Sequence, residues 1–454
     1  KYMIKKINIL KKEFKDIIGI IKLRNFKGNK GIAIKNSFFN LSKTLIAKIG
    51  GLLSVILLAR FLMPELFGIY SLVMATIFIF ISFADLGISS ALVRFVSRAL
   101  GKKDPQKAKG YTKYLFKLEL ILVLIIIGFS IFSAKFIANN YYHQPLFLPL
   151  IIGSLYIFSL PLTTFLESIF FSVGKFKEPV NKEIIFQVFR LIFIIIILFF
   201  IKKSLPEEFL IFLIVFSIAL SSFLGLVYLF FAAKKKISFL KTKLKKIKKN
   251  ERKELKNFMI PLTIIGISGL FLGNIDLIML GYFVRSEFIG YYSAVLFLIG
   301  SFTALLSFSV VLFPIFSRLK GIALNKALKK SVNATLIISG CLIILVIIFS
   351  PFIIKLIYGS DYINSIILLR ILAFSFIPTS IIAIYNSYFI SKGRTKLVAQ
   401  LLIPISILNI ILNYVLITIL LKTSSLAASI GVAGGTVVSL SIHLGLLVFF
   451  SKKK

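Results

Sequence analysis

The chain has 454 residues, of which 58% are hydrophobic and only 16% are charged. An ordinary soluble domain is about half apolar and about one quarter charged, so this composition excludes that class of protein. The 56 Lys and Arg residues outnumber the 16 Asp and Glu residues, for a formal net charge of +40, but most basic residues lie between apolar segments, where they meet lipid headgroups rather than nucleic acid.

Twelve apolar segments are long enough to cross a bilayer, since a spanning helix needs about 20 mostly apolar residues. In chain order they cover residues 37–62, 67–92, 118–138, 147–173, 183–201, 208–233, 257–282, 288–317, 331–357, 365–391, 397–421 and 426–450. The sequence therefore predicts an all-α integral membrane protein with about 12 transmembrane helices.

The connections between these segments test the count, because basic residues concentrate in cytoplasmic loops. With the N-terminus inside, the inside segments hold 45 basic residues, and the outside connections hold only Lys202, Lys203, Arg285 and Lys422. We therefore expect a multi-pass protein of the cytoplasmic (inner) membrane, with its N- and C-termini in the cytoplasm.

Two basic segments, residues 1–35 and 234–256, also carry an apolar stripe at helical spacing. In the second segment the stripe is formed by Leu240, Leu244 and Ile247. Helices of this kind lie on an anionic leaflet, so we expect the anionic lipids of the inner leaflet as partners. For residues 234–256, a plain orientation signal is an equally good interpretation.

The second half of the chain repeats the first. A shift of 222 residues aligns FLMPELFGIYS, from Phe61 to Ser71, with FVRSEFIGYYS, from Phe283 to Ser293. Two later pairs of segments align at shifts of 220 and 219 residues. Each half has an even number of predicted spans, so the repeat is parallel, with its axis along the membrane normal.

The repeat and the charge pattern together predict five segments. These are a basic amphipathic segment at 1–35, a six-helix bundle at 36–233, a polybasic linker at 234–256, a second six-helix bundle at 257–450 and a tail at 451–454. Two similar bundles can rock about a central site, which is typical of transporters.

Basic residues inside the predicted spans are candidates for binding an anionic substrate, because an ionisable group in a bilayer is costly. They are Lys43, Lys48, Arg60, Arg190 and Arg370. Lys43 lies on a narrow stripe of small and polar residues that includes Gly51, and Lys48 borders this stripe. A second interpretation is that Lys43 and Lys48 reach phosphates of the inner leaflet.

The acidic residues inside the spans are Asp85, Glu119, Glu167 and Asp276. Glu167 and Arg190 lie at similar depth on consecutive helices, which predicts an ion pair, and matching depths suggest a second pair between Asp276 and Arg370. Asp85, Glu167 and Asp276 are candidates for ion pairing or for coupling to an ion.

Polar residues also recur at helical spacing in the last two spans. Asn409 and Asn413 are four residues apart, and Thr436, Ser439 and His443 share a face of the next span. They either line an aqueous cavity or hydrogen-bond between helices. The small-residue run at 425–436 favours close helix packing.

Catalytic and metal-binding patterns are missing from the sequence. The single cysteine, Cys341, excludes an internal disulfide, and two separated histidines do not form a metal cluster. We therefore expect no enzyme activity, no cofactor and no metal.

Several runs of residues resemble the polysaccharide-biosynthesis flippases of the O-antigen type. These belong to the multidrug/oligosaccharidyl-lipid/polysaccharide (MOP) exporter superfamily. The runs are LARFLMPELFGIYS from Leu58, FADLGISSALVR from Phe83, NIDLIMLGYF from Asn274, LFPIFS from Leu312, LIYG from Leu356 and YFISKGRTK from Tyr388. The resemblance covers nearly the whole chain from about residue 36 onward.

The resemblance implies a MATE-like exporter architecture that moves a polyprenyl-(di)phosphate-linked oligosaccharide from the inner to the outer leaflet by alternating access. The product would serve cell-surface polysaccharide assembly. A cationic cavity would hold the headgroup, with the five basic residues at the phosphates and Asn274 and Asn409 at the sugars. The implied protein is a monomer, open to association with polysaccharide-assembly proteins, that binds no nucleic acid.

Three alternatives remain at this point. A drug or organic-cation exporter and a peptidoglycan-precursor flippase belong to the same superfamily, but cationic drugs favour unpaired acids, and precursor flippases often carry two further helices. A membrane-bound glycosyltransferase would need a large extramembrane loop, whereas the predicted outside loops are short.

Overall fold

The computed structural model describes residues 28–201, 205–305 and 321–452, together with Leu312, Phe316 and Leu319. Over these residues the fold is entirely helical, without a strand. Nine of the described helical segments are long and apolar enough to cross a membrane, with residues 38–101 counted as one, and a bent helix pair makes a tenth. The predicted all-α membrane architecture is confirmed.

The described residues of the first half form eight helical elements. They are α2 (Gly28–Asp85), α3 (Ile88–Gly101), α4 (Pro105–Phe136), η1 (Ile137–Tyr142), α5 (Phe147–Ser172), α6 (Lys177–Ile196), η2 (Ile197–Ile201) and α7 (Glu207–Lys236).

The described residues after α7 form nine. They are η4 (Ser238–Lys241), α8 (Lys249–Phe283), α9 (Ser286–Leu305), α11 (Gly321–Ile357), η5 (Ser360–Tyr362), α12 (Ser365–Ala373), α13 (Phe376–Ser391), α14 (Thr395–Leu420) and α15 (Ser425–Lys452). The helices α12 and α13 meet at a bend of 41° and together cover the tenth predicted span.

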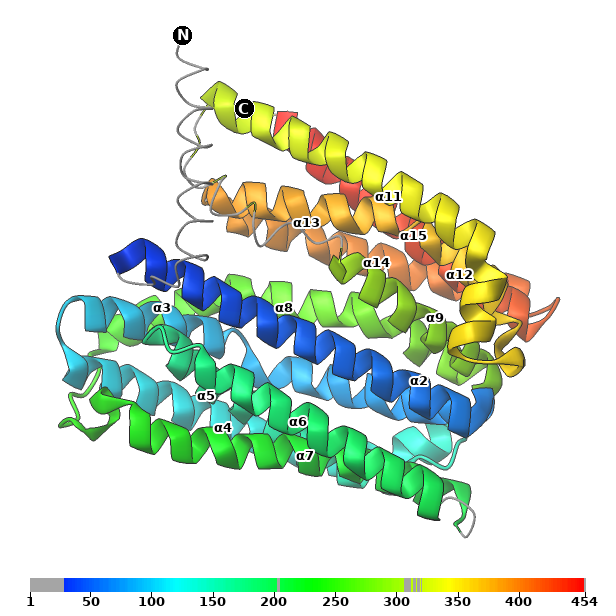
Figure 1. The fold of residues 1–454 in the computed structure, drawn as a ribbon, viewed down its shortest axis with the longest axis horizontal. Helices are drawn as coiled ribbons and strands as arrows, with labels where there is room; N and C mark the ends of the chain where they lie inside the picture. Colours follow the sequence, from blue (N-terminus) through cyan, green and yellow to red (C-terminus); the bar gives the residue numbers. More distant parts are fainter. Residues whose placement is uncertain are drawn as a thin grey trace.

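Helix α2 contains two predicted spans, because the chain turns back at Met63 (Figure 1). Met63 has φ 62° and ψ 171°, which is not helical, and Pro64 follows it. Proline lacks a backbone N–H and disfavours helical geometry in the preceding residue. The sequence Met-Pro therefore ends the first span and begins the second.

The second span is broken again near its middle. Leu86 and Gly87 both have positive φ angles, 43° and 77°, and α3 continues the path from Ile88 to Gly101. The break lies inside the predicted span 67–92, so the structure extends this span by nine residues and divides it into two helices.

The helices run between two ends of the molecule. We call the left end in Figure 1 the basic end; it carries the lysine-rich connections at 102–104, 237–248 and 392–394. The opposite end carries the turn at Met63 and the connections at 143–146, 284–285 and 421–424. That the basic end faces the cytoplasm stays a prediction.

The two halves of the chain occupy the lower and upper parts of Figure 1. In the first half, α4 packs on α5, and α7 packs on α5 and α6; in the second, α15 packs on α12, α13 and α14. Contacts between the halves come mainly from α2 and α3, which pack against α8 and α9. The segment boundaries predicted from the sequence stay predictions.

The repeated segments meet each other at the contact between α2 and α9. A Cβ atom on Gly68 would lie 1.8 Å from the carbonyl oxygen of Ser286, and one on Gly290 would lie 1.9 Å from that of Pro64. Gly290 and Ser286 follow Gly68 and Pro64 by 222 residues, the shift of the repeat. The two crossing helices thus contact one another through equivalent, reciprocal positions, where only glycine fits.

The predicted amphipathic helix in residues 234–256 is wrong. Between the short η4 and α8, the chain has no regular secondary structure. Phe239 and Ile247 are buried in the protein, and only Leu244 of the predicted stripe is exposed. These apolar residues pack against the protein instead of a leaflet. The corresponding stripe predicted near the N-terminus lies outside the described residues.

This linker is fixed to the first turn of α4. Asp104 caps α4 by accepting from the backbone N–H of Lys107 (2.9 Å), and its carboxylate pairs with Lys245 of the linker at 3.1 Å. Lys109 donates to the carbonyl of Thr242. The backbone N–H of Lys107 and the ammonium of Lys245 hold the pKa of Asp104 below its ordinary value.

Candidate functional site

Charged side chains gather between α2, α5 and α6, inside the first half. Glu167 on α5 pairs with Lys43 on α2 and with Lys182 on α6, the latter at 2.7 Å. Lys182 also pairs with Glu183 at 3.0 Å, and Glu183 accepts from the side-chain amide of Gln187 at 2.7 Å. We call these residues, together with Arg190, the charged network.

Most of this network is buried. Glu167, Lys182, Glu183 and Gln187 are only 5–7% exposed. Charges in such a place are tolerated only when they are paired and hydrogen-bonded, since an isolated buried ion costs several kcal/mol. Lys43, Lys182 and Arg190 supply three positive charges against two carboxylates, so the network carries one surplus positive charge.

The surplus charge is associated with Arg190. Its Nη2 donates to the Gln187 Oε1 atom, and its guanidinium lies 5.1 Å from the ring centre of Phe186. Its Nε–H is buried and has no hydrogen-bond partner among the described residues. A buried donor without a partner is costly, and an anion bound beside Arg190 would satisfy it.

The network reaches the contact between the two halves through Gly50 and Gly51 of α2. A Cβ atom on Gly50 would lie 2.5 Å from Gln187 Oε1. A Cβ on Gly51 would lie 3.9 Å from Arg190 Nη2 and 3.5 Å from Phe297 of α9, in the second half. Gly50, which the predicted stripe did not include, therefore lets α6 approach α2, and Gly51 of the stripe lies where Arg190 comes close to the second half.

The five predicted cations do not form one site. Lys43 and Arg190 join the charged network, and Lys48 lies exposed on the same helix without a hydrogen bond or ion pair to any described residue. Arg60 lies at the opposite end, where its Nε donates to the carbonyl of Ile357 at 2.7 Å. Arg370 donates to Ser350 Oγ at 2.8 Å within the second half.

Both predicted ion pairs are wrong. The carboxylate of Glu167 binds Lys43 and Lys182, and Arg190 binds Gln187. Similar depth in the bilayer did not identify the partners, because pairing also depends on how each helix is rotated about its axis. Lys182, Glu183 and Gln187 were missed as site residues, although Glu183 and Gln187 are one helical turn apart and Arg190 follows three residues later.

A second polar cluster surrounds Asp276 of α8, in the second half. Asp276 is 2% exposed, and its carboxylate accepts from Tyr292, Asn413 and Thr436, each at 2.7 Å. Asn409 donates to Ser439 at 3.1 Å beside it. We call these residues the Asp276 network. The predicted pair between Asp276 and Arg370 is thus replaced by bonds to neutral donors.

The Asp276 network settles the two interpretations of the polar faces on the last two spans. Asn409, Asn413 and Ser439 are at most 1% exposed, so they hydrogen-bond between helices. Gly435 lets α14 and α15 approach, since a Cβ there would lie 2.8 Å from Asn413 Oδ1. Asn274, the other predicted asparagine, is half-buried on α8.

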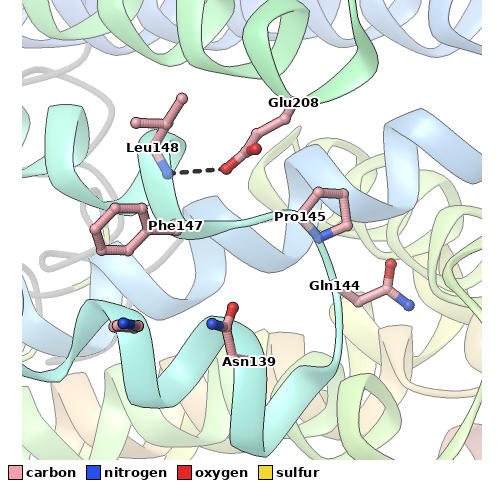
Figure 2. Close-up of a pocket in the computed structure, with 7 residues that line it drawn as sticks. Asn139, Gln144, Pro145, Phe147, Leu148 and Glu208 are labelled. Carbon is pink, nitrogen blue, oxygen red and sulfur yellow. Dashed lines mark hydrogen bonds between the residues drawn. The ribbon is translucent and has the colours of Figure 1, made fainter.

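A separate pocket of about 420 Å³ opens at the opposite end of the first half (Figure 2). It is lined by Lys135, Asn139, Gln144, Pro145, Phe147, Leu148 and Glu208. The carboxylate of Glu208 accepts from the backbone N–H of Leu148 at 3.1 Å, at the start of α5. This bond stabilises a helix N-terminus, so we assign Glu208 a structural role.

Residues 33–320 match the model of a protein family described as "Polysaccharide biosynthesis protein". No curated protein sequence matches the chain.

Solved structures share the fold over nearly the whole chain. The lipid II flippase MurJ, in an inward closed conformation, has a TM-score of 0.70 at 19% identity and covers 91% of this chain and 87% of its own. A multidrug resistance MATE family transporter of the MOP superfamily, in an inward-facing conformation, has a TM-score of 0.65 at 13% identity. The match covers 90% of this chain and 97% of the transporter chain.

A MOP superfamily transporter from Pyrococcus furiosus, for which a binding pocket of reverse polarity is described, has a TM-score of 0.54 at 13% identity, with 94% and 96% covered. At these identities the likeness shows the fold, which is that of the MOP superfamily transporters.

Proposed function

The chain belongs to the polysaccharide biosynthesis protein family, and we propose that it is a flippase that moves a polyprenyl-(di)phosphate-linked oligosaccharide from the inner to the outer leaflet. In this proposal the protein lies in the cytoplasmic membrane with its basic end in the cytoplasm. The glycan and phosphates cross inside the protein, and the lipid tail stays in the bilayer.

The observation that carries the proposal is the surplus positive charge of the charged network. A diphosphate is an anion with several acceptor oxygens, and a planar guanidinium binds such groups through paired N–H donors. Arg190 offers a buried Nε–H without a partner, and Lys48 offers an exposed ammonium on the neighbouring helix. Together with Lys43, these groups form the proposed phosphate site.

Bonds between the halves also limit where the headgroup can leave the protein. At the opposite end, Tyr362 donates to the carbonyl of Ala59 at 3.0 Å, and Arg60 binds the last turn of α11. The contact of Gly68 with Ser286 lies near the same end. These bonds tie the halves together there, so opening toward that side requires the two halves to rock apart.

The Asp276 network is the proposed coupling site. A carboxylate that is fully buried among neutral donors favours binding of a proton or a small cation, because either one removes the unpaired charge. Such a site lies in the second half, apart from the charged network, so ion binding and headgroup binding would bias the same rocking motion from different halves.

Export of organic cations is the main alternative and predicts the reverse charge requirement. A cationic drug would compete with Lys43 and Arg190 rather than bind them, and Glu167 is already neutralised by two lysines. The peptidoglycan-precursor flippase is the nearer rival, because its substrate is also a polyprenyl diphosphate and MurJ shares the fold.

The test is a flipping assay with purified protein in liposomes that contain a polyprenyl-diphosphate-linked oligosaccharide. Exposure of the glycan on the outer face is measured with a membrane-impermeant glycosidase. A hydrogen bond to a charged group contributes about 1.5–3 kcal/mol, so Arg190→Ala should slow flipping about 10- to 150-fold.

Arg370→Ala is the matched control, since it removes a guanidinium bound to Ser350 in the second half. It should leave the rate within about threefold of the unaltered protein, a difference below 1 kcal/mol. Undiminished flipping by Arg190→Ala would contradict the proposed site. Transport of lipid II alone would assign the protein to peptidoglycan-precursor export, and transport of an organic cation alone would assign it to drug export.

A further inference from the structure

A buried glutamate lies in the first half, apart from the charged network. Glu119 on α4 is 0% exposed, and neither of its carboxylate oxygens has a hydrogen-bond partner among the described residues. An ionised carboxylate in such surroundings would cost many kcal/mol, and a protein group in this position takes up a proton instead. Every other acid discussed so far has a cation or at least one hydrogen-bond donor beside it.

Glu119 lies level with the break between α2 and α3. Helices α3 and α4 are joined by the short connection at 102–104 and pack against each other. Helix α3 has 14 residues, so its first residue lies 14 residues before this connection. Glu119 is the fifteenth residue of α4 and lies at nearly the same distance after the connection. Both positions are therefore about 21 Å from it, at a rise of about 1.5 Å per residue.

Asp85 occupies this break. It is the last residue of α2, and its Oδ1 accepts from the backbone N–H of Ser89 at 2.8 Å, so it caps the first turn of α3. A carboxylate is stabilised in this position by the free N–H groups at a helix N-terminus. The Oγ atom of Ser89 is buried and has no partner among the described residues.

Among the residues that the structure describes, no basic side chain pairs with Glu119. Helix α4 packs against α2, α3 and α5, and Asp85 of α2 is the ionisable group that acts electrostatically on Glu119. The charged residues of α3, Arg94 and Arg98, are directed to α8, where they contact Phe258 and Glu254. The single charged residue of α5, Glu167, belongs to the charged network.

The break also contacts the second half of the chain. Thr263 of α8 donates to the carbonyl of Leu86 at 2.8 Å, and a Cβ on Gly87 would lie 2.9 Å from Leu262 of the same helix. Farther along α3, Arg94 lies 4.3 Å from the ring centre of Phe258, and Arg98 pairs with Glu254 at 2.9 Å.

We propose that Glu119 and Asp85 form a proton-binding site that controls the contact of α3 with α8. In this proposal the proton resides on Glu119, while the carboxylate of Asp85 accepts from the backbone N–H of Ser89 at the first turn of α3. Release of the proton to water leaves two negative charges side by side in a buried place, where like charges repel strongly. The repulsion loosens the capped end of α3 and, through it, the contact between the halves at the basic end.

This site differs from the proposed flippase site in its residues and its ligand, and it does not rest on the proposed function. Its first test is infrared spectroscopy of the purified protein at a series of pH values. A protonated carboxyl gives a C=O band that an ionised one lacks. At neutral pH, Glu119→Gln should remove one such band, and Glu183→Gln, which alters a buried but ion-paired carboxylate, should remove none.

Replacing the neighbour makes the test sharper. In Asp85→Asn, the Glu119 band should disappear at a lower pH than in the unaltered protein, because one negative charge fewer opposes its ionisation. An identical band in the unaltered protein and in Glu119→Gln would show that Glu119 is ionised and would overturn the proposal. Loss of the band on adding Na⁺ at constant pH would overturn it in favour of a cation site.

The effect on the contact of α3 with α8 needs a second measurement. Spin labels on Lys102→Cys and Lys253→Cys, in a Cys341→Ser background, report the distance between the exposed ends of these helices. The distance should increase over the pH range in which the Glu119 band disappears. It should stay constant in Glu119→Gln. The same increase in both proteins, or none in either, would contradict control of the contact by this pair.

Discussion

The charged network and the Asp276 network are both buried polar clusters between helices, but they differ in their balance of positive and negative charge. In the first, two carboxylates face three cations from α2 and α6. In the second, one carboxylate faces three neutral donors from α9, α14 and α15. One cluster has a positive charge to spare, and the other has a negative charge without a cation.

The difference separates two kinds of ligand. A cluster with surplus positive charge and an unsatisfied donor favours an anion, whereas a carboxylate held by neutral groups favours a proton or a small cation. The reciprocal contact of Gly68 and Gly290 lies at positions related by the shift of the predicted repeat, yet the two networks carry opposite chemistry. In the proposed function, the anionic headgroup and the coupling ion bind in different halves.

The largest expected effect comes from removing the shared carboxylate of the charged network. Glu167→Ala leaves Lys43 and Lys182 without their common partner, and breaking a buried ion pair in this way costs about 3–5 kcal/mol. The free energy of unfolding, measured with denaturant in detergent micelles, should fall by this amount. Glu207→Ala, which changes an exposed glutamate in the first turn of α7, is the control and should be nearly neutral.

The corresponding change in the Asp276 network should be milder. Asp276→Asn keeps the shape of the side chain, and the hydroxyls of Tyr292 and Thr436 can still bond to it, so we expect a loss of about 1–3 kcal/mol. The same variant should abolish the dependence of flipping on pH or Na⁺. Equal destabilisation by Glu167→Ala and Asp276→Asn would remove the distinction between the two networks.

A smaller effect on stability, with a clear effect on binding, is expected at Gly50. A new Cβ there would displace the end of the flexible Gln187 side chain and break its bond to Arg190. Gly50→Ala should cost about 1 kcal/mol of stability and weaken binding of a prenyl diphosphate, measured by thermal shift.

Gly51→Ala is the matched control, because its Cβ would make only an ordinary contact, 3.5 Å from Phe297. It should leave prenyl-diphosphate binding unchanged. If Gly51→Ala weakened binding as much as Gly50→Ala, the role assigned to Gln187 and Arg190 would be wrong.

The smallest effect should come from the exposed pair at the basic end. The pKa of Asp104 is held below its ordinary value by the Lys107 N–H and by Lys245. The ionised Asp104 therefore stabilises the fold at pH values above its ordinary pKa of about 3.9. This stabilisation is lost as the pH falls through the lowered pKa of the folded protein. Asp104→Ala should lower Tm slightly at neutral pH, and the difference should shrink on acidification. A difference that grew toward low pH would contradict this role.

The sequence predicted the helices well because helix length in a membrane is a local property. Each predicted span lies on a described helix, apart from the part of 288–317 that lies outside the described residues. The predicted end of the first span at residue 62 also agrees with the turn at Met63, and Gly51 of the predicted stripe lies at a close helix contact. In contrast, the break at Leu86 and Gly87 divides a run that is uniformly apolar enough to be predicted as one span.

The linker shows where local pattern misleads. Leu240, Leu244 and Ile247 have helical spacing, but Phe239 and Ile247 pack against the first half of the protein, and the chain from 242 to 248 forms no helix. A regular spacing of apolar residues predicts that these residues are buried. Whether lipid or protein buries it depends on which surface is close enough.

By itself, the sequence determined that this is a many-spanning membrane protein and that charged residues lie inside its apolar segments; the repeat of its halves stays a prediction. Only the tertiary structure decided which charges pair, because a pair needs atoms within about 4 Å. That distance depends on the rotation and spacing of helices far apart in sequence. The sequence places Glu167 and Arg190 at the same depth in the membrane. However, because α2 packs against α5 and α6, Glu167 pairs with two lysines, and the Nε–H of Arg190 has no partner among the described residues.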